Sequence, residues 1–318
     1  MLQLHIMRKF LVAALVVAMP SFALAQDAPV RNIAGDFAST WEASKNMPMA
    51  ERVAAFKKNV ASQYPEFYAA SRFGGEEKQD ARIARAIEKF GTIRDAYLDK
   101  VKRFGDAMPL HIATFRAVFS DFRLSMPTWL VHSLHEMDGG TRDFNGRTDL
   151  IFGADMMATL HADDDLTPLF HHELFHVYHE PRFSCGTEAV WKNLWEEGLA
   201  VYVSQALNPK ATPAEMLLNF PHGMPDATEA QLPAAWAQLE RELDNTDPAL
   251  YAELFSTAQS KSTLPARRGY YLGYLLAKEA GKSSDVTTLA HLNCDQVHTL
   301  VKNIVHRKRL ETQVAAAR

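Results

Sequence analysis

The sequence predicts a mainly helical chain with one small antiparallel β-sheet, an α+β fold. Apolar residues recur at spacings of three and four over Met49–Val60 and Asp80–Val101, which is typical of amphipathic helices. Over Pro127–Ala158 the pattern changes to short apolar runs with turn residues between them, and helical patterns then return. We therefore expect an N-terminal helical region over residues 26–123 and a catalytic region over residues 124–318.

Two strands are expected within the β region. The run Thr128–Leu134 has strand character, and Asp149–Asp155 is predicted to be its hairpin partner. The Gly- and Asp-rich stretch Asp138–Arg147 would form the turn between them. The strand Asp149–Asp155 would lie at the sheet edge, where an extended substrate backbone could pair with it.

The next predicted helix begins near Thr167, a suitable N-cap, followed by Pro168 in the first turn. It carries His172-Glu173-Leu-Phe-His176. Two histidines four residues apart project from one face of a helix and can share one metal ion. Glu173 would lie beside that ion, where it can take a proton from water. The alternative is coincidence, because this short pattern also occurs in unrelated helices.

A third ligand is expected from the second strong helical pattern, Val190–Ser204. It carries Glu197, which 20 intervening residues separate from His176, a gap long enough for a loop and a returning helix. Gly198 would let the two helices approach closely. Glu196 is the candidate for a solvated acid on the same helix.

Two further histidines and several acids are candidates for roles at the same site. His179 lies seven residues after His172 and is a rival third ligand, although three ligands over two turns converge poorly on one ion. His171 points elsewhere on the helix and is expected to pack or to support a ligand. Asp155 and Asp163–Asp165 are candidates for the groups that orient the ligand imidazoles.

The two motifs together resemble the signature of the gluzincin metallopeptidases. In that group a Glu-Gly-x-Ala helix follows the His-Glu-x-x-His helix and completes a zinc site, as Glu197-Gly198-x-Ala200 would here. The resemblance implies a zincin-like fold and one Zn²⁺ per chain, bound by His172, His176 and Glu197. It also implies that Glu173 is the general base.

A later segment resembles a poorly characterised bacterial family of predicted zinc-dependent proteases. Gly269-Tyr270 and Gly273-Tyr274 match the Gly-Tyr-x-x-Gly-Tyr helix that follows the zinc motifs in that family. Tyr270 is therefore a candidate catalytic residue that stabilises an oxyanion, with Tyr274, Arg267 or Arg268 as other candidates. The alternative is a tightly packed helix with tyrosines at its rim. A Gly-x-Met-Glu-Asn segment, typical of the large gluzincin aminopeptidases, is absent from the sequence.

Residues 1–25 have the pattern of a cleavable signal peptide. Arg8 and Lys9 precede the apolar run Phe10–Met19, and the small residues Ala23 and Ala25 follow it. The run is too short to cross a bilayer of about 30 Å as an anchor. We expect cleavage after Ala25, a periplasmic or secreted protein, and no transmembrane segment after cleavage.

The two cysteines, Cys185 and Cys294, form either one disulfide or two buried thiols, and the sequence leaves both open. A net charge of -4 without a basic patch excludes nucleic acid as an expected partner. The prediction is an exported zinc metallohydrolase, a peptidase acting on peptide or protein substrates. The alternatives are a non-catalytic zinc-binding protein or degenerate metallopeptidase, and a helical structural protein with a coincidental motif.

Overall fold

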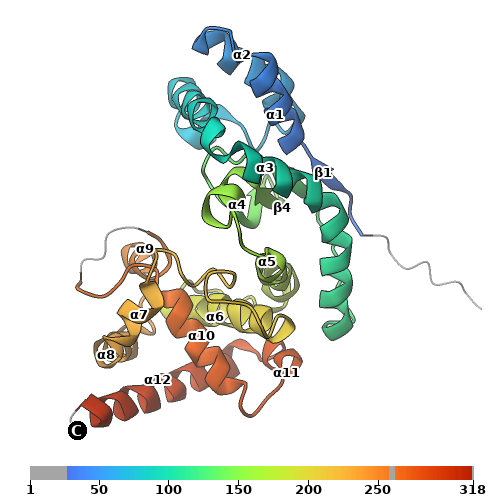
Figure 1. Cartoon of the computed structure of the whole chain (residues 1–318). Coiled ribbons are helices and arrows are strands. Elements are labelled where there is room, and N and C mark those ends of the chain that lie inside the picture. Colours follow the sequence, from blue (N-terminus) through green and yellow to red (C-terminus); the bar gives the residue numbers. More distant parts are fainter. Residues whose placement is uncertain (1–26, 258–261, 317–318) are drawn as a thin grey trace, which may run out of the picture.

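The computed structural model describes residues 27–257 and 262–316 (Figure 1). The predicted signal peptide, residues 1–25, lies outside them. The described chain is mainly helical with one four-stranded sheet. This confirms the prediction of a mainly helical chain with a small sheet. No helix in this part of the chain is long and apolar enough to cross a membrane.

The N-terminal elements and the sheet are β1 (Val30–Asn32), α1 (Ala34–Ala43), α2 (Met49–Asn59), α3 (Glu76–Val118), β2 (Thr128–Val131), β3 (Gly139–Phe144) and β4 (Arg147–Gly153). The remaining helices are α4 (Ala154–Leu160), α5 (Thr167–His179), α6 (Val190–Leu207), α7 (Met224–Glu229), α8 (Leu232–Glu242), α9 (Pro248–Phe255), α10 (Arg268–Ala280), α11 (Val286–Ala290) and α12 (Cys294–Ala316). In Figure 1, α1 to α4 gather at one end of the molecule and α6 to α12 at the other, with α5 between them.

The sheet is mixed, with the strand order β1-β2-β4-β3, so the prediction of an antiparallel sheet was wrong. β2 runs parallel to both β1 and β4, and only β3 and β4 are antiparallel. The hairpin partner of β4 is therefore β3, which lies inside the stretch predicted to be a turn. The turn itself is only Asn145-Gly146, and both residues have positive φ, as a two-residue hairpin turn requires. β3 escaped prediction because its half-buried, polar sequence lacks apolar alternation.

In this strand order the edge strands differ from the predicted one. β4 is a central strand, and Leu150, Ile151 and Phe152 are fully buried, so it cannot accept an additional strand as predicted. The edges are β3 on one side and β1 on the other. β1 lies within the region predicted to be helical, and three exposed residues leave no periodic signal.

Helices α5, α6 and α10 pack consecutively, α5 on α6 and α6 on α10. The closest approach involves Gly198 of α6 and Gly273 of α10, where a Cβ atom on Gly198 would lie 2.1 Å from the carbonyl carbon of Gly273. Gly198 was expected to bring α6 close to the helix of the His-Glu-x-x-His motif, and its partner is α10 instead. The glycines of α10 thus mark a tightly packed helix, the alternative that the sequence had offered.

The two cysteines form one disulfide, which answers the question that the sequence left open. Cys185 in the loop before α6 is bonded to Cys294 at the start of α12, with Cα atoms 5.6 Å apart. The bond spans 109 residues, so it fastens the last helix of the chain to the loop beside α5.

Candidate metal centre

Helix α5 is buried along its length from Pro168 to His179. It begins at Thr167, and the residue that holds this end is Asp165, whose Oδ1 accepts hydrogen bonds from the backbone N and the Oγ1 of Thr167 at 2.9 and 2.7 Å. Thr167 is therefore the first helical residue and not the N-cap. Because α5 is enclosed by α3, α6 and β3, its polar side chains must find partners inside the protein.

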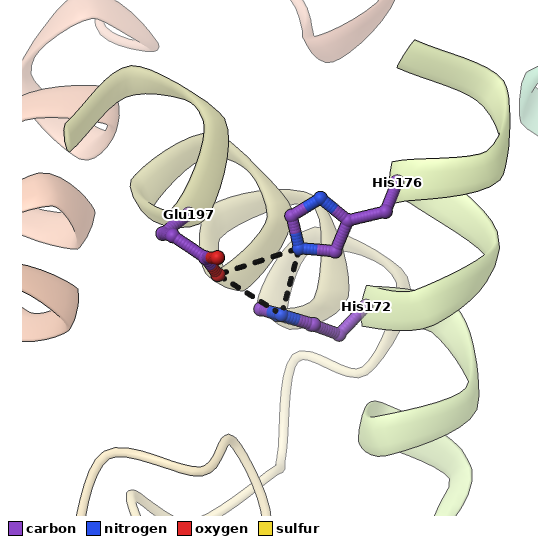
Figure 2. A group of neighbouring side chains, drawn as sticks. All are labelled: His172, His176 and Glu197. Atoms are coloured by element: carbon purple, nitrogen blue, oxygen red, sulfur yellow. Dashed lines mark hydrogen bonds and ion pairs between the residues drawn. The ribbon is translucent and has the colours of Figure 1, made fainter. Parts of the chain in front are cut away.

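The three predicted ligands converge from α5 and α6 (Figure 2). His172 Nε2 and His176 Nε2 are 3.1 Å apart. Glu197 Oε2 lies 3.5 Å from His172 Nε2 and 3.3 Å from His176 Nε2. Two largely buried imidazole nitrogens and the oxygen of a partly buried carboxylate, arranged in this way, could hold a metal ion.

The charges at this cluster are strongly coupled. Burial opposes ionisation of Glu197, but His176 and His172 hold its pKa well below its usual range. Burial likewise opposes charge on His176, yet Glu197 and Glu173 raise its pKa to about 10. Without a cation, the cluster therefore retains a proton on an imidazole beside the carboxylate. A divalent ion would replace that positive charge, so protons and metal compete for the same atoms.

Glu173 is buried beside the cluster, against the first residue of the edge strand β3. A Cβ atom on Gly139 would lie 2.8 Å from Glu173 Cγ, so only glycine leaves room for this side chain. Burial raises the pKa of Glu173 to about 8, and the charges of Asp138 and Glu197 act in the same direction while His176 opposes them. Gly139 was not expected at the site because it had been placed in a turn.

The other ring nitrogens of the two histidines have different surroundings. His176 Nδ1 lies 3.7 Å from Glu180 Oε1. His172 Nδ1 is buried with no hydrogen-bond partner in the described chain. Glu180 had not been considered, although its spacing of four residues from His176 places it on the same helical face.

The acids predicted to support the ligands lie elsewhere. Asp155 accepts hydrogen bonds from the backbone N of Ser133 and His135 at 2.6 and 2.7 Å, and so shapes the loop after β2. Asp164 lies 3.4 Å from His161 Nδ1. Asp165 binds the start of α5, as described above, and no contact joins Asp163 to the cluster within the described residues.

His179 and His171 do not join the cluster. His179 is fully buried between the rings of Phe175 and Phe183, with centroids 5.0 and 4.8 Å away, and neither of its nitrogens has a hydrogen-bond partner among the described residues. His171 Nδ1 lies 2.8 Å from Asn208 Nδ2. Both histidines therefore have packing roles.

Helix α10 brings only one of the two candidate tyrosines toward the cluster. Burial, and then the charge of Glu197, raise the pKa of Tyr270 well above its usual value, which keeps its phenol protonated and able to donate. The hydroxyl of Tyr274 instead donates to Gln205 Oε1 at 2.7 Å. The guanidinium of Arg267 lies 4.4 Å from the Tyr270 ring centroid. Arg268 is fully buried and bonded to Glu253, so it has a structural role.

Two pockets adjoin the cluster. One, of about 460 Å³, is lined by the candidate ligands His176 and Glu197 together with Glu180, Cys185 and Tyr251. The other, of about 380 Å³, is lined on one side by Met137 and Asp138, next to Gly139, and on the other by Phe255 and Arg267. The first pocket reaches two residues of the cluster directly, and the second is lined by residues that neighbour Gly139 and Tyr270.

Comparisons with protein-family models, with curated proteins and with solved structures find no match to this chain. The resemblance to the gluzincins thus depends on the two motifs and stays a prediction.

Proposed function

We propose that this protein is a zinc-dependent metallohydrolase that cleaves peptide bonds. The observation that carries the proposal is the triangle of His172 Nε2, His176 Nε2 and Glu197 Oε2, with sides of 3.1, 3.5 and 3.3 Å. Ligands about 2.0–2.1 Å from a tetrahedral zinc ion are separated by about 3.3–3.4 Å. The triangle therefore fits zinc without rearrangement of the helices.

The ligand set supports a catalytic ion. Structural zinc sites have four protein ligands, whereas catalytic sites have three and leave one position open, which agrees with two histidines and one glutamate here. When bound, zinc would supply Lewis acidity toward a carbonyl oxygen and lower the pKa of water at the open position.

The chain's own residues complete the chemistry. The raised pKa of Glu173 applies to the cluster without a cation, and a cation bound there would favour the ionised carboxylate. In that form Glu173 takes a proton from the attacking water and later delivers it to the leaving amine. Its burial against Gly139 fixes the carboxylate beside the cluster and excludes bulk water. Tyr270, held protonated by burial, donates a hydrogen bond to the carbonyl oxygen as negative charge develops there.

A peptide substrate is supported by the edge strand β3. Its first residue contacts Glu173, and its outer side has no partner strand in the sheet. An extended peptide could pair with this edge and bring a carbonyl group to the cluster. This assigns to β3 the role that the sequence had suggested for Asp149–Asp155.

Export to the periplasm or the exterior is part of the proposal. The Cys185–Cys294 disulfide supports it, because such bonds form and persist in oxidising compartments.

The test is metal analysis and peptide-library digestion of the wild type and two variants. Glu173→Gln should retain about one zinc per chain and lose hydrolysis, because it removes the base but no ligand. Glu197→Gln should lose both. Glu196→Gln is the matched control, since Glu196 bonds to Lys192 on the same helix, and it should retain both.

Three results would contradict the proposal. Wild type without zinc would exclude the metal centre. Hydrolysis that persists in Glu173→Gln would exclude the base. Zinc without hydrolysis in the wild type would indicate the non-catalytic zinc-binding alternative.

A further inference from the structure

The pocket on the Asp138 side of the metal centre is lined by a guanidinium group that has no ion pair in the described part of the chain. This pocket, called here the Arg267 pocket, has a volume of about 380 Å³. Its lining includes Met137, Asp138, His161, Phe220, Phe255 and Arg267.

Arg267 packs against two rings and makes no ion pair within the described residues, although, against the effect of burial, its charge adds to the larger effect of His161 in lowering the pKa of Asp138. Its guanidinium carbon lies 5.4 Å from the centroid of Phe220 and 4.4 Å from that of Tyr270. Its Nε is buried without a hydrogen-bond partner, and no ion pair joins the guanidinium to the described residues. The neighbouring Arg268 differs, because it donates to Pro265 O at 2.9 Å, to Gln238 Oε1 at 2.6 Å and to Glu253.

The acids that line the same pocket already have partners. Asp138 Oδ2 lies 3.2 Å from His161 Nε2. Glu136 Oε1 accepts from Arg72 at 2.7 Å and from Arg142 at 3.1 Å. Arg267 Nε is therefore a buried donor beside this pocket with no acceptor among the described residues, and such donors are costly enough that a ligand supplying an acceptor would be favoured.

The Arg267 pocket adjoins the metal centre on two walls. On one wall, Asp138 precedes Gly139, whose backbone contacts Glu173. On the other, Arg267 lies over Tyr270, and the Tyr270 ring meets Phe255 of the pocket edge to face at 5.7 Å. A substrate residue in this pocket would lie next to the bond at the cluster.

We propose that Arg267 binds a carboxylate of the substrate, so that the enzyme acts on peptides with a carboxylate close to the cleaved bond. The planar guanidinium can donate two parallel hydrogen bonds to one carboxylate, and the flanking rings hold the guanidinium in a fixed orientation. The carboxylate has two sources, the C-terminus of a peptide or an acidic side chain. This inference rests on the proposed function and adds its substrate class.

The test is calorimetric binding of three acetylated hexapeptides to the zinc-loaded Glu173→Gln protein, which does not require turnover. The first is six alanines with a free C-terminus, the second the same peptide as an amide, and the third an amide with glutamate at its fourth position. Alanine lets the peptides shift register until a carboxylate reaches the pocket.

We expect at least one carboxylate peptide to bind about tenfold more tightly than the neutral amide, as a charge-assisted hydrogen bond provides. Preference for the first peptide identifies the C-terminus, and preference for the third identifies a side chain. Adding Arg267→Gln should remove the preference, and Arg267→Lys should retain part of it, because lysine keeps the charge but not the two parallel donors. The matched control Arg241→Gln alters an exposed arginine of α8 that donates to its own helix, and should bind like the parent.

Equal binding of all three peptides would overturn the proposal, as would a preference that survives in Arg267→Gln. Thermal unfolding establishes that the variants are folded. If Arg267→Gln does not fold, the comparison uses Arg267→Lys, in which the preference for a carboxylate peptide should be weaker than in the parent. Since binding is measured apart from hydrolysis, these outcomes are distinct from a failure of the wild type to cleave peptides.

Discussion

Gly198 of α6 and Gly273 of α10 touch backbone to backbone, and this contact places two functional elements against each other. A Cβ atom on Gly273 would lie 2.4 Å from Leu194 O, and one on Gly198 would lie even closer to Gly273. Glu197 directly precedes the first glycine, and Tyr270 lies one helical turn before the second. The spacing of the two helices therefore sets where both side chains lie relative to the metal centre.

Gly198→Ala is expected to destabilise the protein by about 1–3 kcal/mol, as overpacking of a core does. It should also weaken zinc binding, because α6 must move with Glu197. Thermal unfolding and zinc titration measure the two effects. The control is Gly91→Ala in α3, where a Cβ atom would meet nothing within 4 Å; it should be neutral or more stable by up to about 1 kcal/mol. Normal stability and zinc affinity in Gly198→Ala would show that the helices do not need this contact.

His179→Phe is expected to stabilise the protein by about 1–3 kcal/mol, because it replaces a buried imidazole without hydrogen-bond partners by an apolar ring of similar shape. Zinc content should not change, and a loss of zinc would revive His179 as a ligand. His179→Ala, which leaves a cavity, should destabilise. Urea unfolding of the three proteins makes the comparison.

His179→Phe should also change how the stability of the protein depends on pH. Burial, followed by the charge of His176, lowers the pKa of His179 to about 3. Between that value and the unfolded pKa of about 6.5 the unfolded chain binds more protons, so this histidine costs stability as the pH falls through the window. The stability gap between His179→Phe and wild type should therefore widen from pH 7.5 to pH 5. A constant gap in urea unfolding would indicate a normal pKa.

Glu180→Ala is expected to weaken zinc binding about tenfold, the lower range for residues that orient a ligand. The Glu180 carboxylate lies 3.7 Å from His176 Nδ1, so it favours the ring orientation that turns Nε2 toward the metal. Competition with a chromogenic chelator measures the affinity. Glu188→Ala is the control, since Glu188 lines the same pocket with a side chain 77% exposed. Equal affinities in the two variants would show that Glu180 does not orient His176.

Replacing both cysteines by serine is expected to cost about 2–5 kcal/mol of stability, because the bond closes a long loop of the unfolded chain. That loop spans 109 residues and contains α6 to α11. Urea unfolding of wild type with and without a reducing agent should show the same loss, with no effect of the reductant on the variant. Identical wild-type curves would mean that the thiols are not bonded in solution.

The relations within one helix could be predicted from the sequence. The spacing of His172 and His176 places their rings on one face whatever surrounds them, because the helical rise and turn are local properties. Glu180 could have been predicted in the same way, because it follows His176 by four residues. Glu197, the candidate third ligand, was predicted from its place on a returning helix and then from the resemblance of the two motifs, and the structure brings it to the same cluster.

The sheet could not be predicted to the same depth. The residues of β4 were recognised from their apolar run, but a run of buried residues is compatible with parallel and antiparallel neighbours alike. Its pairing with β2 and β3 depends on contacts between distant segments. Because β4 is a central strand, β3 is the edge strand, and Gly139 at the start of β3 lies against Glu173.

By itself the sequence identified the residues of the candidate site, namely two histidines and a glutamate with the spacing of metal ligands and a second glutamate as the candidate base. Only the tertiary structure decided which side chains surround it: Gly273 as the partner of Gly198, Tyr270 rather than Tyr274, and Arg267, which makes no ion pair among the described residues, beside a pocket. The physical reason is that backbone geometry sets the direction of side chains along one helix. Which helices and strands meet depends on packing the whole core, and no short pattern encodes that.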